Sequence, residues 1–341
     1  MRKLTKSQKK YQQIRARYQA KRHSKSWKKR KKGRRRTVEL QKIRRRKQVR
    51  KTPIPLPSPS NFSLIQNTDE VLGYFELARK HLHKEDNVML DISGVEILTP
   101  ESVALMVASI NDKQFMDESI VTGNAPIKPD LMKLFTGSGY YEHVRTNGKF
   151  EKDEASLLHK EKHKKVEPEV ARIALQRGLD HVFGSKKVDL GAMYDILIEC
   201  MSNTKSHADL TSEGSCFWWL YVYNDPNTKI STYTFLDLGV GIFKSATVQG
   251  FINKLRKATG FYPNINIVDD LLAGNIKSRA KIDTDIRGKG IPQIVENAKS
   301  PIFRSFYIIA NDVKINLKTG AREQLQHSLN GTLLYWELEA S

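Results

Sequence analysis

The sequence predicts an α/β protein in which a basic N-terminal arm, residues 1–52, precedes two folded regions. Strand and helix patterns alternate over residues 61–146 and again over residues 169–341. Such alternation is typical of sheets covered by helices. A proline-rich linker, residues 53–60, follows the arm, and a charged connector, residues 147–168, joins the two regions.

The arm holds most of the positive charge. Residues 1–52 contain 25 of the 58 Lys and Arg residues and one acidic residue, Glu39, whereas the rest of the chain has 33 basic and 36 acidic side chains. Too few apolar residues are present to bury a core, so we expect the arm to be disordered when free. When Lys and Arg side chains bind nucleic-acid phosphates, counterions are released, so we expect the arm to bind RNA or DNA. The alternatives are a solubilising tail or a contact with anionic membranes.

Composition argues against several other classes of protein. Cys200 and Cys216 lie in apolar stretches, and we expect both to be buried, reduced thiols. His159 and His163 are expected in a solvated helical connector rather than in a metal site. No apolar run has the length of a membrane span, and the charged N-terminus does not resemble a signal peptide. We therefore expect a cytoplasmic protein without a membrane partner.

The elements expected in residues 61–146 are short and alternate in type. Strands are predicted at Phe62–Ile65, Val88–Ile92 and Ile120–Val121, and helices at Asp69–Leu82, Glu101–Ile110 and Pro129–Phe135. This order predicts a parallel or mixed sheet with helices outside it.

One run in this region resembles part of a STAS domain. Val88–Met106 reads Val-Met-Leu-Asp-Ile-Ser-Gly-Val-Glu-Ile-Leu-Thr-Pro-Glu-Ser-Val-Ala-Leu-Met, similar to the central strand, loop and helix of that family. The family's switch proteins carry an Asp and a phosphorylatable Ser in the loop. Thr99, Pro100 and Glu101 stand at those places, so the acceptor is missing or displaced to Thr99 or Ser102. We therefore expect this STAS-like region to act as a scaffold or to dock a protein partner.

The elements expected in residues 169–341 are longer. Helices are predicted at Val170–Phe183, Leu190–Asn203 and Ile291–Ala298, and strands at Cys216–Tyr223, Ile230–Leu236, Phe303–Ile309, Asp312–Leu317 and Thr332–Leu338. The segment Phe243–Ile286 is predicted to be a mobile lid that contains a helix over Thr247–Ala258.

Glu199 and Asn203 are the first candidate functional residues. Their spacing of four places both side chains on one face of the predicted helix. A carboxylate beside an amide oxygen can activate water and hold a hard cation. Taken alone, the pair is also compatible with an ordinary solvated helix face.

Three later segments carry further candidate residues. Asp237-Leu-Gly-Val-Gly241 follows an apolar strand, and its glycines allow a tight backbone turn. Arg287-Gly-Lys-Gly290 opens a helix, where main-chain amides can bind anions. Gly331-Thr332 precedes the last strand.

In this order and at these distances, the four segments resemble the N box, the two glycine boxes and the closing Gly-Thr of the Bergerat-fold (GHKL) ATP-binding domain. Histidine kinases, anti-sigma-factor kinases, DNA gyrase and mismatch-repair ATPases share this domain. The resemblance covers residues 169–341. It implies an α/β sandwich with a mixed sheet and helices on one face, and it implies ATP and Mg²⁺ as cofactors.

The resemblance also assigns expected roles to individual residues. Glu199 would orient or deprotonate the attacking water, Asn203 would coordinate Mg²⁺, and Asp237 would accept the adenine amine. Further nucleotide contacts are implied for Gly239, Gly241, Gly288, Lys289, Gly290 and Thr332.

The leading hypothesis is an ATP-driven conformational switch with slow ATPase activity, which associates with nucleic acid through residues 1–52. One alternative is a protein kinase of the anti-sigma or histidine-kinase type, with its Ser or His acceptor on a partner. Another is a nucleic-acid-binding scaffold that holds ATP without hydrolysing it. Members of the family often form homodimers, so a homodimer is also considered.

Overall fold

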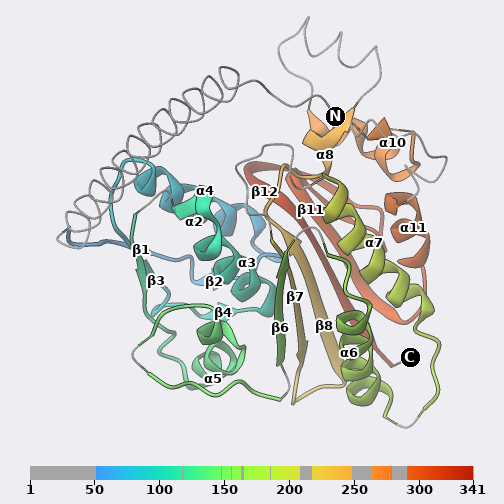
Figure 1. Cartoon of the computed structure of the whole chain (residues 1–341), viewed down its shortest axis with the longest axis horizontal. Helices are drawn as coiled ribbons and strands as arrows, with labels where there is room; N and C mark the ends of the chain where they lie inside the picture. Colours follow the sequence, from blue (N-terminus) through green and yellow to red (C-terminus); the bar gives the residue numbers. More distant parts are fainter. Residues whose placement is uncertain are drawn as a thin grey trace, which may run out of the picture. The chain divides into compact units, whose positions relative to one another are not determined.

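The chain is mixed α/β and divides into two units between Thr52 and Pro53, where the basic arm is predicted to end (Figure 1). The computed structural model describes residues 51–116, 119–146, 148–154, 156–162, 165–184, 186–207, 217–247, 263–275, 277–278 and 290–340. The predicted disorder of the arm concerns residues outside this set. Pro53–Ser341 forms one compact unit, so the two predicted folded regions are not separate bodies.

A five-stranded sheet lies at the centre of this unit. Its order is β11-β12-β8-β7-β6, with β6 at Ser156–Lys162, β7 at Phe217–Asn224, β8 at Ile230–Asp237, β11 at Phe303–Asn316 and β12 at Arg322–Glu339. All four strand pairings are antiparallel, so the predicted mixed sheet is wrong for the described strands. Short turns join β7 to β8 and β11 to β12, and strands joined in this way pair antiparallel.

Three of the described helices cover one face of the sheet (Figure 1). They are α6 at Pro168–Gly178, which continues as the π-helical turn η2 at Leu179–Phe183, α7 at Gly191–His207 and α11 at Gly290–Asn297. Aromatic rings fill the core on this side: Trp336 lies between Tyr233 and Phe306, with ring centroids 5.4 Å away in near-parallel planes. The Tyr233 hydroxyl donates a hydrogen bond of 2.8 Å to the Ala174 carbonyl and thereby ties β8 to α6.

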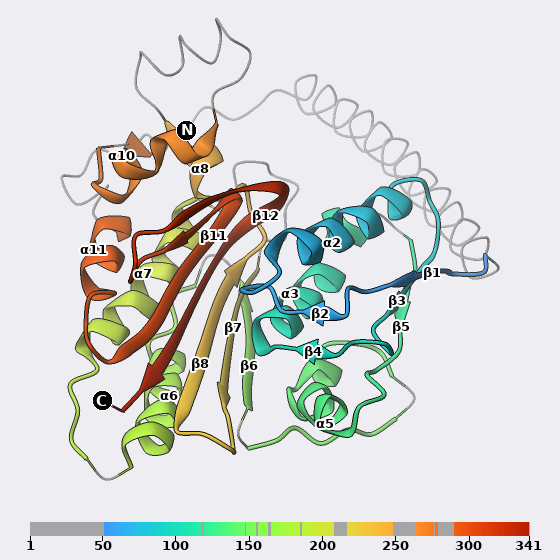
Figure 2. The same ribbon diagram turned by 180° about the vertical axis from the view of Figure 1, so that it is seen from behind.

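The opposite face of the sheet is covered by helices from the first region (Figure 2). They are α2 at Thr68–Leu82 and α3 at Pro100–Asn111, within one residue or two of their predicted bounds. One continuous core joins their buried side chains to those of the sheet, namely Leu158, Trp219, Tyr221, Leu236, Ile309, Leu325, Leu329, Leu333 and Tyr335.

Polar contacts fix α2 against β12. The Asp69 carboxylate accepts hydrogen bonds from the main-chain N–H groups of Gln326 and His327, at 2.8 and 3.0 Å. His327 Nδ1 lies 2.8 Å from Glu76 Oε2. Hydrogen bonds from Lys80 and His327 lower the pKa of Glu76 to about 2. The N-terminal half of β12 was not predicted as a strand, and it is the half that binds α2.

The first region contains the predicted parallel sheet. Its order is β1-β3-β5, with β1 at Ile54–Pro57, β3 at Val88–Asp91 and β5 at Val121–Gly123. Strands β2 (Asn61–Phe62) and β4 (Ile97–Leu98) form a separate parallel pair, and α4 (Lys113–Met116), α5 (Pro129–Gly137) and η1 (Tyr140–Glu142) complete the region.

The prediction of a linker over residues 53–60 is wrong for residues 54–57, because these form strand β1. Prolines alternate with Ile54, Leu56 and Ser58, so proline removes the N–H only at every second residue. The N–H groups of Ile54 and Ser58 donate to main-chain carbonyls at Asn87 and Asp91. The missing donors therefore face the free edge of the sheet, where proline is tolerated and discourages pairing with further chains.

The prediction of a helical connector over residues 147–168 is also wrong, because this segment contains strand β6. Residues Ser156–Lys162 pair with β7 and form one edge of the five-stranded sheet. The His159 ring packs 5.3 Å from Trp218, and the Lys160 ammonium lies 4.2 Å from the centre of the Phe217 ring. Aromatic neighbours on β7 cover these polar side chains, which sequence periodicity alone classes as solvated.

The predicted lid is described only in part. Its described elements are α8 at Ile242–Ser245, β9 at Ala246–Thr247, η3 at Asn264–Ile267, α10 at Val268–Leu272 and β10 at Lys277–Ser278. Thr247 belongs to a strand, and the remainder of the helix predicted over Thr247–Ala258 lies outside the described residues. Within the part of the chain that is described, no helix has both the length and the apolar character to cross a bilayer.

Candidate functional site

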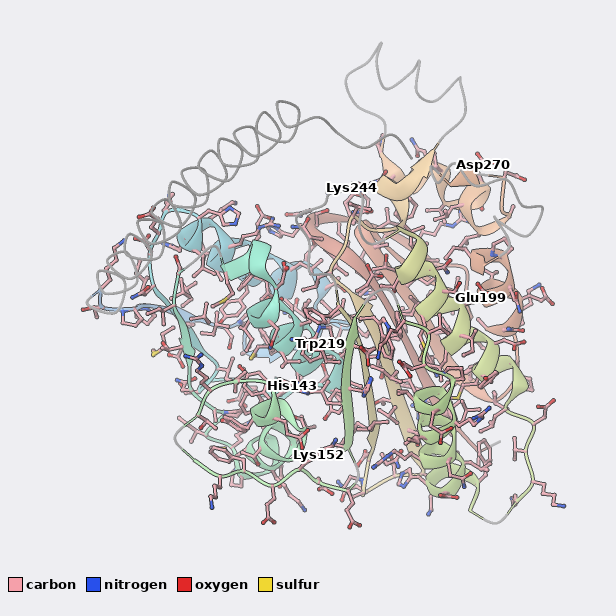
Figure 3. All side chains as sticks on the ribbon, in the orientation of Figure 1. His143, Lys152, Glu199, Trp219, Lys244 and Asp270 are labelled. Carbon is pink, nitrogen blue, oxygen red and sulfur yellow. The ribbon has the colours of Figure 1, made fainter. Side chains whose placement is uncertain are left out.

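Glu199 lies on the side of α7 that faces the start of α11 (Figure 3). Asn203 lies on the same side, because both side chains approach Gly290, the first residue of α11. The opposite side of α7 packs into the core through Met193, Ile196, Leu197, Cys200 and Met201. This amphipathic pattern holds the helix in place and leaves the polar pair on the side away from the core. The predicted shared face is confirmed.

Gly290, the first residue of α11, lies directly against the polar pair. A Cβ atom at this position would lie 2.8 Å from Glu199 Oε2 and 3.0 Å from Asn203 Oδ1. Only glycine avoids this clash, so the backbone at the start of α11 packs directly on the two polar side chains of α7, a contact that we call the cradle. Gly288 and Lys289, the other predicted residues of this segment, lie outside the described residues.

The two polar side chains of the cradle have no partner. Across the described residues, neither Glu199 nor Asn203 makes a side-chain hydrogen bond or an ion pair. Burial, together with the nearby Asp195 carboxylate, raises the pKa of Glu199. Half-buried polar groups without a partner are suited to binding something else.

Asp237 forms the second part of the site, at the end of β8. It pairs with Thr332 of β12 on one side and with Trp218 of β7 on the other. Burial raises the pKa of the Asp237 carboxyl to about 7, opposed by a hydrogen bond from the Gly239 main chain. A carboxyl with this pKa changes its charge near neutral pH.

Cys200 connects the two parts of the site. Its buried thiol lies close enough to both Asp237 and Glu199 that their charges add to the effect of burial and raise its pKa. The predicted buried thiol is therefore confirmed for Cys200, whereas Cys216 lies outside the described residues. The position of Cys200 shows that α7 and the end of β8 border one region.

Two glycines set the backbone around Asp237. Gly331 has φ 143°, and a Cβ atom there would overlap the Asp237 carbonyl oxygen. Gly241 has φ 79°, and a Cβ atom there would lie 2.5 Å from Asn311 Oδ1. The Gly331-Thr332 segment and the Asp237–Gly241 turn therefore pack against each other and against β11 through their backbones.

Asn311 is a positioning residue that the sequence analysis missed. It has φ 51° and occupies a bulge in β11. Its Nδ2 group donates to the Val240 carbonyl at 3.0 Å, and its Oδ1 atom accepts from the Lys244 N–H at 3.3 Å. The sequence does contain a signal for this role, because Asn311 lies in the break between the predicted strands Phe303–Ile309 and Asp312–Leu317. Asparagine tolerates positive φ better than most residues.

Asn203 is the candidate metal ligand of the site. Among the described residues, no group of three or more His, Cys, Asp or Glu side chains is placed to hold a metal. The Asn203 amide oxygen is a suitable single ligand for Mg²⁺, whose other ligands are commonly water and phosphate.

Comparison with known proteins adds no relative: no protein-family model matches the sequence, and neither does any curated protein. A function is therefore inferred from the four sequence segments and from their geometry.

We expect Gly241→Ala to cost more stability than Gly320→Ala. Both glycines have positive φ, 79° and 75°, so alanine pays a similar backbone cost of roughly 1–2 kcal/mol at each. Only at Gly241 does the new Cβ meet Asn311, because nothing lies within 4 Å at Gly320. Urea unfolding of both variants measures the difference. Equal losses would show that Asn311 does not constrain the turn.

Proposed function

We propose that residues 169–341 form a Bergerat-type domain that binds Mg–ATP and hydrolyses it slowly. The observation that carries this proposal is the cradle in which Gly290 lies against Glu199 and Asn203. The two segments are about 90 residues apart in the sequence, and the resemblance assigns both to the phosphate end of one nucleotide site. The segments with Asp237 and Thr332, assigned to the adenine end, are adjacent in the sheet.

The adenine end of the proposed site is formed by Asp237 and its neighbours. A carboxylate accepts hydrogen bonds, so it selects the exocyclic amine of adenine over the carbonyl of guanine. The tight backbone at Gly239 and Gly241 leaves room for a flat ring next to this carboxylate. Thr332, directly opposite Asp237 in the register, would hold a water molecule at the same ring edge.

At the phosphate end, Glu199 acts as the general base. Its raised pKa brings the carboxylate closer to the value that suits proton abstraction near neutral pH. The Asn203 oxygen would hold Mg²⁺, an ion that would supply charge neutralisation for the phosphates. The amides at the start of α11 bind the same phosphates through their N–H groups.

The sheet offers a mechanical route for a conformational switch. Helices α7 and α11 of the proposed site cover one face, and α2 and α3 cover the other. Movement of α11 or of the Asp237–Gly241 turn on nucleotide exchange would therefore alter the surface under the STAS-like region. That region then presents the change to a protein partner. Ser102 and Glu101 are buried there, so a phosphorylated acceptor in this loop is not part of the proposal.

We expect Glu199→Gln to bind Mg–ATP but to release phosphate at least about 100-fold more slowly, because a general base is lost. Asn203→Ala should lose both binding and release. Glu169→Gln, an exposed position on α6, is the matched control and should change neither. Calorimetric titration and a phosphate-release assay measure the two quantities. Undiminished turnover in Glu199→Gln would show that Glu199 is not the general base. Transfer of the γ-phosphate label to a protein would favour a kinase.

We expect ATP affinity to rise with pH and to level off above about 7. The carboxylate form of Asp237 is the acceptor, and its pKa is raised from 3.8 to about 7, so protonation competes with binding below that value. Affinity should increase about ten-fold between pH 6 and pH 8 from this group. Asp237→Asn keeps an acceptor oxygen but does not titrate. The titration of the nucleotide itself affects the wild type and Asp237→Asn equally. The same pH dependence of ATP affinity in both proteins would therefore exclude Asp237 as the titrating acceptor.

We further propose that the basic arm brings this domain to nucleic acid. The charge of residues 1–52 is concentrated in one segment outside the compact unit, and the unit itself is nearly neutral. Binding through such an arm depends on phosphate contacts rather than on base sequence.

Removing residues 1–52 should abolish salt-sensitive binding of RNA and DNA and leave Mg–ATP affinity unchanged. Fluorescence anisotropy with labelled oligonucleotides at two salt concentrations measures the first effect, and the full chain serves as the control. Equal nucleic-acid binding by the shortened chain would assign the interaction to the folded unit instead.

A further inference from the structure

A pocket of about 120 Å³ lies between α2, α3 and the end of the five-stranded sheet. It is on the face of the sheet opposite α7, so it is distinct from the cradle at Gly290. Its apolar side chains are Leu72, Phe75, Leu105, Phe115, Leu238 and Leu329. Its polar side chains are Glu76, Arg79, His83, Ser109, Asp112, Ser328 and Asn330.

Arg79 is the unsatisfied charge in this pocket. Within the described part of the chain its guanidinium group makes no hydrogen bond and no ion pair. The two acidic side chains of the lining are already engaged. Glu76 binds Lys80 at 2.7 Å and His327 at 2.8 Å, and Asp112 accepts from the Phe115 N–H at 3.2 Å.

The lining points to the chemical class of an occupant. A guanidinium group recognises a carboxylate through two parallel hydrogen bonds, and the six apolar side chains suit a hydrocarbon or aromatic body. A phosphate dianion is less suitable, because Glu76 and Asp112 repel a second negative charge. The volume is close to that of a cavity of about 150 Å³ that accepts benzene. Benzoate and hexanoate therefore represent the right size.

The pocket adjoins the proposed nucleotide site along the backbone. Leu238 immediately follows Asp237, and Asn330 immediately precedes Gly331. Gly331 packs so closely on the Asp237 carbonyl that the two segments move together. An occupant that contacts Leu238 and Asn330 can therefore shift the backbone next to Asp237, the proposed adenine-binding carboxylate.

We propose that this pocket binds a small monocarboxylate with an apolar body, and that its occupancy changes the affinity of the nucleotide site. The second half of this inference rests on the proposed function. The first half depends only on Arg79 and the apolar lining.

The test is calorimetric titration of benzoate and hexanoate into the full chain, with benzyl alcohol and 1-hexanol as uncharged controls. We expect the carboxylates to bind and the alcohols to bind at least ten-fold more weakly. Arg79→Gln should weaken carboxylate binding at least ten-fold, Arg79→Lys should have a smaller effect, and Arg172→Gln on exposed α6 should have none. Equal binding by the wild-type protein and Arg79→Gln, or no binding by the wild type, would overturn the proposal.

Coupling is tested by titrating Mg–ATP with and without saturating benzoate. A change of at least three-fold in ATP affinity, absent in Arg79→Gln, is the expected result. An unchanged ATP affinity would overturn the regulatory half. If ATP does not bind at all while benzoate still binds through Arg79, the proposed nucleotide function fails and the pocket assignment stands.

Discussion

Burial of the five-stranded sheet on both faces is the constraint on which the rest of the structure depends. On the side of α2 and α3 the described strands of the sheet contribute nine buried side chains, including Trp219, Tyr221 and Tyr335. Each fully buried side chain of this size contributes roughly 1.5–3 kcal/mol. Together they amount to more than 10 kcal/mol by this order-of-magnitude estimate, which is comparable with the stability of a whole domain. The first region therefore acts as the second cover of the sheet, and its detachment would expose a large apolar surface.

This constraint also determines where chemistry can occur. The interior of the sheet is filled on both sides and encloses buried polar atoms that have no hydrogen-bond partner, such as Thr234 Oγ1, Ser305 Oγ and Trp336 Nε1. The half-exposed candidate side chains lie instead at the end of the sheet and on the helices that border it. Asp237 lies at the end of β8, and Glu199 and Asn203 lie on the side of α7 away from the core. Asn311 and Gly331 hold the backbone at that end. The pocket with Arg79 lies at the same end but on the opposite face, so the two sites share backbone without sharing side chains.

The sequence predicted the parts of the fold that local patterns control. Helices α2 and α7 have a clear apolar stripe, α3 is buried along most of its length, and the predicted bounds of all three were close to those observed. Strand β1 was missed because its proline content indicates a spacer, although alternate prolines are compatible with an edge strand. Strand β6 was missed because its charged residues are covered by aromatic rings of β7, a contact that only the fold supplies. The cradle at Gly290 was anticipated by motif spacing, whereas the positioning role of Asn311 and the pocket depend on segments distant in the sequence.

The central claim is that nucleotide binds between α7, the start of α11 and the end of β8. Hydrogen–deuterium exchange of the full chain with and without Mg–ATP tests it most directly, because it locates the bound nucleotide along the backbone. The account predicts slower exchange at residues 199–207, 237–241, 288–297 and 329–333, and no such protection in Asn203→Ala. Two results would contradict nucleotide binding at this place. One is the absence of any protection, and the other is protection confined to residues 1–52, where a basic arm can attract any polyanion.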